Sequence, residues 1–209
     1  MIMHRYFGMI KTLGLIDRAY VVNRDQDVDR MARTAKRLGN VEIPFIRFSA
    51  KCFSDADGHQ SAGERGNYAS HLEIIETAQK EGLSNVLIME DDVIFRDDFI
   101  DLWNQILPKF KDLEYDIFYG YNWRNKGGRA DKIGLALIPS TLCTHFYVVH
   151  SRFYATFIQI ARANQNTRRA HAIDGIITSK IAVLSGVQSS RKGFVVSYCI
   201  EGKRESKRV

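Results

Sequence analysis

The sequence predicts an α/β fold with a mixed, mainly parallel central sheet flanked by helices. Two patterns indicate this fold class. Apolar segments of strand length alternate with segments of helix length from residue 18 onward, which is the order of elements in an α/β sheet. The segment "NVLIM" at 85–89 is apolar throughout, as expected for a strand covered on both faces. We expect one domain over 1–209, with a core at about 18–202 and a basic tail at 203–209.

The chain opens with a predicted strand, helix and strand. "RAYVVN" at 18–23 has the length and apolar character of a short buried strand. The polar segment after it has a helical pattern that ends at Gly39, a good helix stop. Residues 41–50 alternate apolar and polar after Pro44, as a second strand would.

The middle of the chain carries an acidic triplet between two predicted helices. The first helix starts at Asn67, closes at Gly82 and places apolar side chains on one face. The strand at 85–89 follows it, and Glu90, Asp91 and Asp92 come directly after that strand. The second helix is amphipathic and spans 97–110, where Asp97 and Asp98 suit its first turn.

The second half continues the alternation. Strands are predicted at 115–120, 135–140, 144–150 and 193–200. Helices are predicted at 151–164, with Ser151 as N-cap, and at 172–183. The polar, glycine-bearing segment 121–134 is predicted to be a loop.

Charge is distributed unevenly along the chain. The net charge is +6, made of −5 over residues 1–118 and +11 over residues 119–209. A basic half can contact nucleotide phosphates, an anionic membrane surface or nucleic acid, or it can be only a solvated face. No nucleic-acid-binding motif is present and the first half is acidic, so no nucleic-acid partner is expected.

The cysteines and the N-terminus favour a cytoplasmic location. Cys52, Cys143 and Cys199 are odd in number, far apart and in or beside apolar segments, which suits buried free thiols in a reducing compartment. The apolar N-terminus is interrupted by charge and lacks a small-residue cleavage site. A peripheral position at the inner face of a membrane is compatible with the basic second half.

The acidic triplet predicts a metal site. Ligands of open α/β sheets bind beyond the carboxyl ends of the strands, which is where Glu90, Asp91 and Asp92 are expected. Their mutual repulsion falls if a cation joins them, and hard ions such as Mg²⁺ prefer oxygen ligands. Such an ion would accept diphosphate oxygens from a nucleotide-activated donor. The alternative is that Asp91 and Asp92 only start a turn.

Four segments stand in a characteristic order along the chain: "AYVVNRDQDVDRM", "ERGNYASHLEIIETAQKEGLSNVLIMEDDVIF", "THFYVVH" and "AIDG". Together they resemble glycosyltransferase family 25, which includes lipooligosaccharide and collagen galactosyltransferases. The first resembles the family's first strand and its Asp-Arg motif, the second its Ser-His segment, helix, strand and Glu-Asp-Asp motif, and the last two resemble later segments. The similarity runs from about Arg18 to Gly202, although Arg65 stands where the family usually has an apolar residue.

This resemblance implies a GT-A fold and a metal-dependent hexosyltransferase. The expected cofactor is Mn²⁺ or Mg²⁺, and the expected donor is a UDP-sugar, with galactose as the hexose and inversion as the outcome. The expected acceptor is a saccharide or a lipid-linked saccharide, as in lipopolysaccharide biosynthesis. A catalytically degenerate relative that only binds a sugar nucleotide, and a basic nucleic-acid-binding protein, are the two alternatives.

The resemblance also assigns roles to residues. Asp92 is the expected metal ligand, with Asp91 as a second or indirect one. The expected donor-binding residues are Asn23, Arg24, Arg30, Ser70, His71, Glu90 and Asp91. Arg30 is alternatively a surface residue of a helix, and His71 a capping or packing residue at a helix start. His145, His150 and His171 are the candidates for a third metal ligand.

Asp174 is the candidate general base. It matches the family's downstream aspartate and lies between the apolar residues Ile173 and Ile176. Partial burial there would raise its pKa, which suits a base that takes a proton from an acceptor hydroxyl.

Overall fold

The computed structural model describes residues 14, 16–110, 115–120, 135–138, 144–165, 170, 172–176 and 197–200. Its strands are β1 (Arg18–Asn23), β2 (Ile46–Ser49), β3 (Asn85–Glu90), β4 (Ile117–Tyr119), β5 (Leu135–Ile138), β6 (Phe146–His150) and β7 (Ser197–Ile200). Its helices are α1 (Val28–Asn40), α2 (Ala62–Lys80), α3 (Phe99–Phe110) and α4 (Ser151–Gln165). In this part of the chain, no helix is long and apolar enough to cross a membrane.

The seven described strands form one mixed sheet in the order β2-β1-β3-β6-β4-β7-β5. β1, β2 and β3 are parallel, and β6 runs antiparallel between β3 and β4. β7 is parallel to β4, whereas β5 is antiparallel to β7. Only β5 and β6 therefore oppose the common direction, so the predicted α/β class with a mixed, mainly parallel sheet is confirmed.

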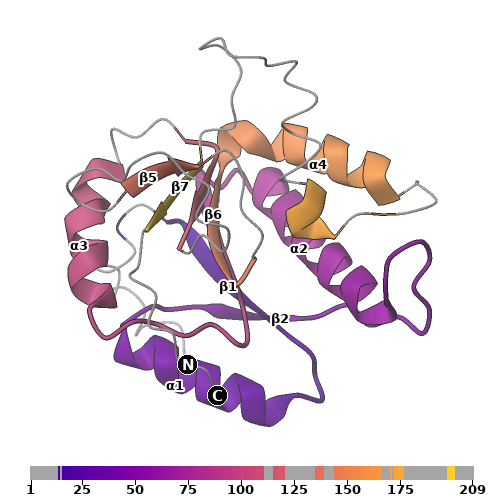
Figure 1. The fold of residues 1–209 in the computed structure, drawn as a ribbon, viewed down its shortest axis with the longest axis horizontal. Helices are drawn as coiled ribbons and strands as arrows, with labels where there is room; N and C mark the ends of the chain where they lie inside the picture. Colours follow the sequence, from indigo (N-terminus) through magenta and orange to yellow (C-terminus); the bar gives the residue numbers. More distant parts are fainter. Residues whose placement is uncertain are drawn as a thin grey trace.

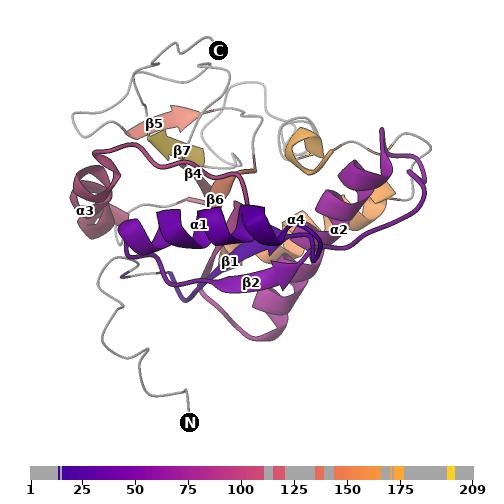
Figure 2. The ribbon, with the colours of Figure 1, turned by 90° about the horizontal axis from the view of Figure 1, so that it is seen from below.

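Helices cover both faces of the sheet. Figure 1 shows α2 and α4 side by side on one side, with α3 on the other, and Figure 2 shows α1 lying along β1 and β2. Side chains of β3 alternate between two cores: Ile88 packs in the cluster under α2 and α4, and Leu87 packs in the cluster under α1 and α3. Both side chains are fully buried. This alternation explains why the sequence of β3 is apolar without a polar face.

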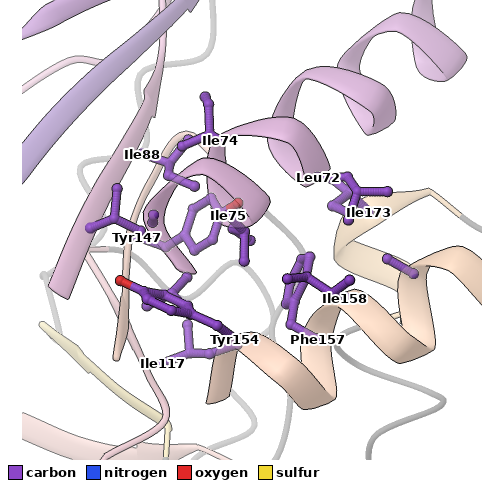
Figure 3. Packing of buried hydrophobic residues seen from close by; sticks show 14 of the residues in the cluster. Leu72, Ile74, Ile75, Ile88, Ile117, Tyr147, Tyr154, Phe157, Ile158 and Ile173 are labelled. Carbon is purple, nitrogen blue, oxygen red and sulfur yellow. The ribbon is translucent and has the colours of Figure 1, made fainter. Parts of the chain in front are cut away.

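The core between the sheet and helices α2 and α4 contains mostly β-branched and aromatic side chains. Figure 3 shows Ile74 and Ile75 of α2 facing Tyr147 and Ile88 of the sheet, with Phe157 of α4 below them. These contacts pack α2 and α4 against β3 and β6.

Two sequence-based expectations about α2 and the cysteines were wrong. α2 begins at Ala62 rather than Asn67, because the Ser61 hydroxyl caps the helix. It accepts a hydrogen bond of 3.0 Å from the Glu64 backbone amide. His71 consequently lies in the middle of α2 and not at its start. Cys52 is a free thiol, as expected, but it is exposed and not buried.

The predicted helix at 172–183 is described only in part. A single helical turn spans residues 173–176, and residues 177–183 lie outside the described part of the chain. His171, Cys143 and the loop at 121–134 also lie outside it.

Candidate functional site

The polar residues gather at the carboxyl ends of β1 and β3. From β1 the chain continues to β2 on one side of it, whereas β3 pairs on its other side. Such a change of direction opens a crevice at the ends of the strands, which is the usual ligand site of an α/β sheet. Asn23 ends β1 and Glu90 ends β3. Because β6 is antiparallel, the residues before it return to the same edge, where the Glu90 amide donates to the His145 carbonyl at 3.1 Å.

Glu90, Asp92 and His145 form a group that fits a divalent cation. One ligand atom from each lies within 4.8 Å of the other two. The site offers two carboxylates and an imidazole, a donor set that suits Mn²⁺ better than Mg²⁺, since Mg²⁺ favours oxygen ligands alone. The side chains of Asp92 and His145 are each 46% exposed and Glu90 is half-buried, so the group is open to solvent. This openness leaves room for ligands from a substrate.

The surroundings of Asp92 keep its carboxylate ionised. Its pKa is lowered by a hydrogen bond from His145 and, to a lesser extent, by the charge of Arg30, whereas burial acts in the opposite direction. The His145 Nε2 atom lies 3.5 Å from Asp92 Oδ2, and Arg30 Nη2 lies 3.6 Å from the same oxygen. An ionised carboxylate at neutral pH is the form that binds a metal.

Glu90 accepts hydrogen bonds from two side chains and lies close to a third. Thr144 Oγ1 donates to Glu90 Oε1 at 2.5 Å, and Asn67 Nδ2 donates to the same oxygen at 3.3 Å. His71 Nε2 approaches it to 3.7 Å. The segment before β6 and helix α2 therefore surround one carboxylate.

His71 lies behind Glu90. It is fully buried, stacks on Tyr147 with ring centroids 5.6 Å apart, and has its Nδ1 atom 2.8 Å from the Tyr147 hydroxyl. Burial lowers the pKa of His71 to about 4, and burial raises the pKa of Tyr147 well above its ordinary value. Both groups are therefore neutral at pH 7, and in the tautomer in which the Tyr147 hydroxyl donates to Nδ1, the Nε2 atom carries the proton toward Glu90. Nε2 has no hydrogen-bond partner among the described residues.

Ser70 is also fully buried, and its hydroxyl forms hydrogen bonds with two backbone groups of the protein. Its hydroxyl donates to the Gly66 carbonyl at 2.6 Å and accepts the Lys51 amide at 2.8 Å. Ser70 therefore fixes the segment after β2 against α2.

Asp91 points toward α1 and β1. Asn23 Nδ2 donates to Asp91 Oδ2 at 2.7 Å, and Arg30 Nη2 pairs with Asp91 Oδ1 at 2.5 Å. The Thr34 hydroxyl of α1 donates to the Asp91 backbone carbonyl. Asp91 is not part of the described cation group, so its expected role as a second metal ligand stays a prediction. Arg30 bridges Asp91 and Asp92, which places it inside the site.

A pocket of ≈ 500 Å³ lies beside these carboxylates. Its polar and charged lining residues are Asn23, Arg24, Gln26, Asp27, Arg30, Lys51, Asn67, Glu90 and Asp91. Arg24, which is exposed, donates to Asp27 at 2.5 Å. Cationic side chains next to a carboxylate group suit a ligand that combines phosphates with a divalent ion.

Asp174 has the expected environment. It is half-buried on the turn 173–176, with Ile173 and Ile176 buried. Burial raises the pKa of Asp174, and the charges of Glu90 and Glu64 add to the effect. Asp174 does not line the described pocket.

The strand register separates the histidine candidates. His150 pairs with Asn85 at the start of β3, whereas Glu90 lies at its carboxyl end. His150 is therefore at the opposite end of the strands from the site. Of the two candidates in the described part of the chain, His145 and His150, it is His145 that lies beside Asp92. Asn67, Thr34 and Thr144 were missed by sequence reasoning, because single threonine and asparagine residues carry no distinctive pattern; only the position of Thr144 before a strand was a signal.

Comparison with known proteins gave two findings. The model of a family described as "Glycosyltransferase family 25 (LPS biosynthesis protein)" matches residues 16–164. A solved structure of a glycosyltransferase involved in the glycosylation of the major capsid of PBCV-1 is similar over 72% of this chain, at 12% identity and a TM-score of 0.41. This chain covers 65% of the length of that protein. No curated protein sequence matched significantly.

Proposed function

Because this chain belongs to glycosyltransferase family 25, we propose that it transfers a hexose from a UDP-sugar to a saccharide or lipid-linked saccharide. The observation that carries the proposal is the group Glu90, Asp92 and His145 at the edge of a pocket with arginine side chains. Galactose is the proposed hexose and the GT-A type the proposed arrangement, both following from the family resemblance.

Glu90, Asp92 and His145 would hold Mn²⁺. The bound ion would supply a positive charge that stabilises the diphosphate as it leaves. Arg30 and Arg24 would bind phosphate oxygens, because both line the pocket. Asn23 would orient Asp91 toward Arg30, and His71 and Thr144 would keep Glu90 in position.

Asp174 is proposed as the general base of an inverting transfer. The acceptor hydroxyl oxygen attacks the anomeric carbon, the bond from that carbon to the diphosphate oxygen breaks, and the hydroxyl proton passes to Asp174. A raised pKa makes this carboxylate a better proton acceptor than an exposed aspartate.

A catalytically degenerate, nucleotide-binding relative is the second candidate. It is favoured by the C-terminal segment, where Tyr198 and Gly202 stand near the places at which the family usually has Pro and Gln, and by Arg65, which replaces an apolar residue of the family motif. Transfer or hydrolysis of UDP-sugars in the presence of Mn²⁺ separates this candidate from an active transferase.

Thermal-shift screening tests the choice of donor. A ligand that binds only the native state raises the melting temperature. We expect UDP-galactose to do so when Mn²⁺ is present, and more than UDP-glucose does. An equal shift with UDP-glucose contradicts the proposed hexose, and no shift with any UDP-sugar contradicts the proposed donor class.

A further inference from the structure

The segment between β2 and α2 presents an aromatic ring to the polar pocket. Phe53 lines the pocket together with Lys51 and Cys52, and 38% of its surface is exposed. Cationic side chains account for the phosphate part of a nucleotide ligand, but they do not account for an aromatic ring in the same pocket.

The backbone beside Phe53 is fixed before any ligand binds. The Ser70 hydroxyl accepts a hydrogen bond of 2.8 Å from the Lys51 amide, and the Ala50 amide donates to the Asn23 carbonyl at 3.0 Å. Gly66 of α2 packs so closely that a Cβ atom there would lie 2.2 Å from the Lys51 carbonyl oxygen. The segment is therefore anchored to both β1 and α2.

The ring of Phe53 is fixed as well. The guanidinium carbon of Arg65 lies 4.0 Å from the ring centroid, a cation–π contact. Arg65 is itself held by Asp55 at 2.5 Å and Asp57 at 3.0 Å. A side chain ordered in this way loses little conformational entropy when a ligand stacks on it.

We propose that Phe53 is a stacking platform for the nucleobase of the donor nucleotide, held in place by Arg65. The guanidinium lies over the ring, and Phe53 is among the residues that line the pocket. Aromatic rings bind bases through their π-faces, and the pocket volume of ≈ 500 Å³ lies in the range of ordinary small-molecule sites. This inference rests on the proposed function, because it specifies how the same pocket recognises a UDP-sugar.

Calorimetric titration with UDP and with inorganic pyrophosphate, both in Mn²⁺, tests the platform. Pyrophosphate offers the same phosphate chemistry without a base. We expect Phe53→Ala to weaken UDP binding by about 5- to 150-fold and to leave pyrophosphate binding unchanged. Phe53→Trp is expected to retain UDP binding and to show fluorescence quenching by UDP but not by pyrophosphate.

The controls separate stacking from a general effect on the pocket. Ile46→Ala removes another exposed apolar side chain, on β2, outside the pocket lining, and should leave both affinities unchanged. Unchanged UDP binding in Phe53→Ala, or an equal loss for UDP and pyrophosphate, overturns the platform while the proposed function stands. If the folded wild-type protein binds no UDP at all, the proposed function and the platform both fail.

Discussion

Asp92 and Asp174 differ in the direction in which the protein shifts their pKa. His145 and Arg30 favour the ionised form of Asp92, whereas burial favours the neutral form of Asp174. The first environment suits a metal ligand and the second a proton acceptor. The two aspartates therefore make separable predictions.

Asp92→Asn is expected to weaken Mn²⁺ binding by at least about tenfold, because it removes a charged ligand. The matched control is Asp98→Asn in the second acidic pair, since Asp98 is ion-paired with Arg96 at 2.7 Å. Calorimetric titration of the two variants with Mn²⁺ compares their affinities for the ion. Equal Mn²⁺ affinities in the two variants would remove Asp92 from the metal site.

Asp174→Asn is expected to lower the transfer rate by about 10²- to 10⁴-fold and to raise the melting temperature at pH 7. A raised pKa means that the folded protein binds this proton more tightly than the unfolded chain does. Stability is therefore greatest below the ordinary value of 3.8 and falls as pH rises through the folded pKa. Asparagine carries no charge at pH 7, so the variant avoids the loss of stability that comes from ionising the buried carboxyl group.

Melting temperatures of Asp174→Asn and wild type across a pH series show whether the substitution stabilises or destabilises the protein. The stabilisation should be present at pH 7 and vanish near the ordinary aspartate pKa of 3.8. A variant that is less stable than wild type at pH 7, or that transfers sugar normally, contradicts the assignment.

For single residues, the sequence predicted the location of those that directly follow a predicted strand. Glu90 and Asp92 follow a buried strand, so their place at the sheet edge could be inferred. His145 could not be chosen over His150 from sequence, because the choice depends on the antiparallel register of β6 against β3. The side-chain directions of Asp91 and His71 likewise depend on long-range packing.

The elements β1, β3 and α2 hold the site together. The strands were predicted almost to the residue, because buried parallel strands are continuous apolar runs. The first turn of α2 was missed because Gly63 and Gly66 reduce its helix propensity. Gly66 is present because the Lys51 carbonyl packs against it, a contact between distant segments that no local pattern reports.

Gly66→Ala is expected to destabilise the protein by about 1–3 kcal/mol, because the new methyl group would collide with the Lys51 backbone. Gly63→Ala, three residues earlier in the same helix, is the matched control. Its nearest neighbour would be the Ser61 Oγ atom at 3.7 Å, an ordinary contact. The control should be neutral or stabilising by up to about 1 kcal/mol.

Urea denaturation of both glycine variants gives the comparison. If Gly66→Ala is as stable as Gly63→Ala, the segment after β2 is not anchored to α2. That result would also weaken the case for a preformed wall of the pocket.

At the scale of the whole molecule, the acidic first half and the basic second half bear on how the protein would meet the proposed acceptor. The net charge of +11 over residues 119–209 favours an anionic surface, where each Lys or Arg contributes about 1 kcal/mol of attraction. The sequence reveals this asymmetry directly, whereas the identity of the acceptor depends on the shape of loops.

We expect the protein to sediment with vesicles that contain anionic lipid at low ionic strength and to dissociate as salt is added. Neutral vesicles are the control, and a variant that lacks residues 203–209 should bind more weakly. Absence of binding at low ionic strength would remove the membrane contact from the account.

The claim that the protein carries out metal-dependent transfer from a UDP-sugar is tested by the release of UDP from UDP-hexoses in the presence of saccharide acceptors. We expect wild-type protein to release UDP in Mn²⁺, release to stop on addition of EDTA, and Asp92→Ala to be inactive. UDP release that continues in EDTA, or at the wild-type rate in Asp92→Ala, would contradict the claim, as would folded wild-type protein that releases none.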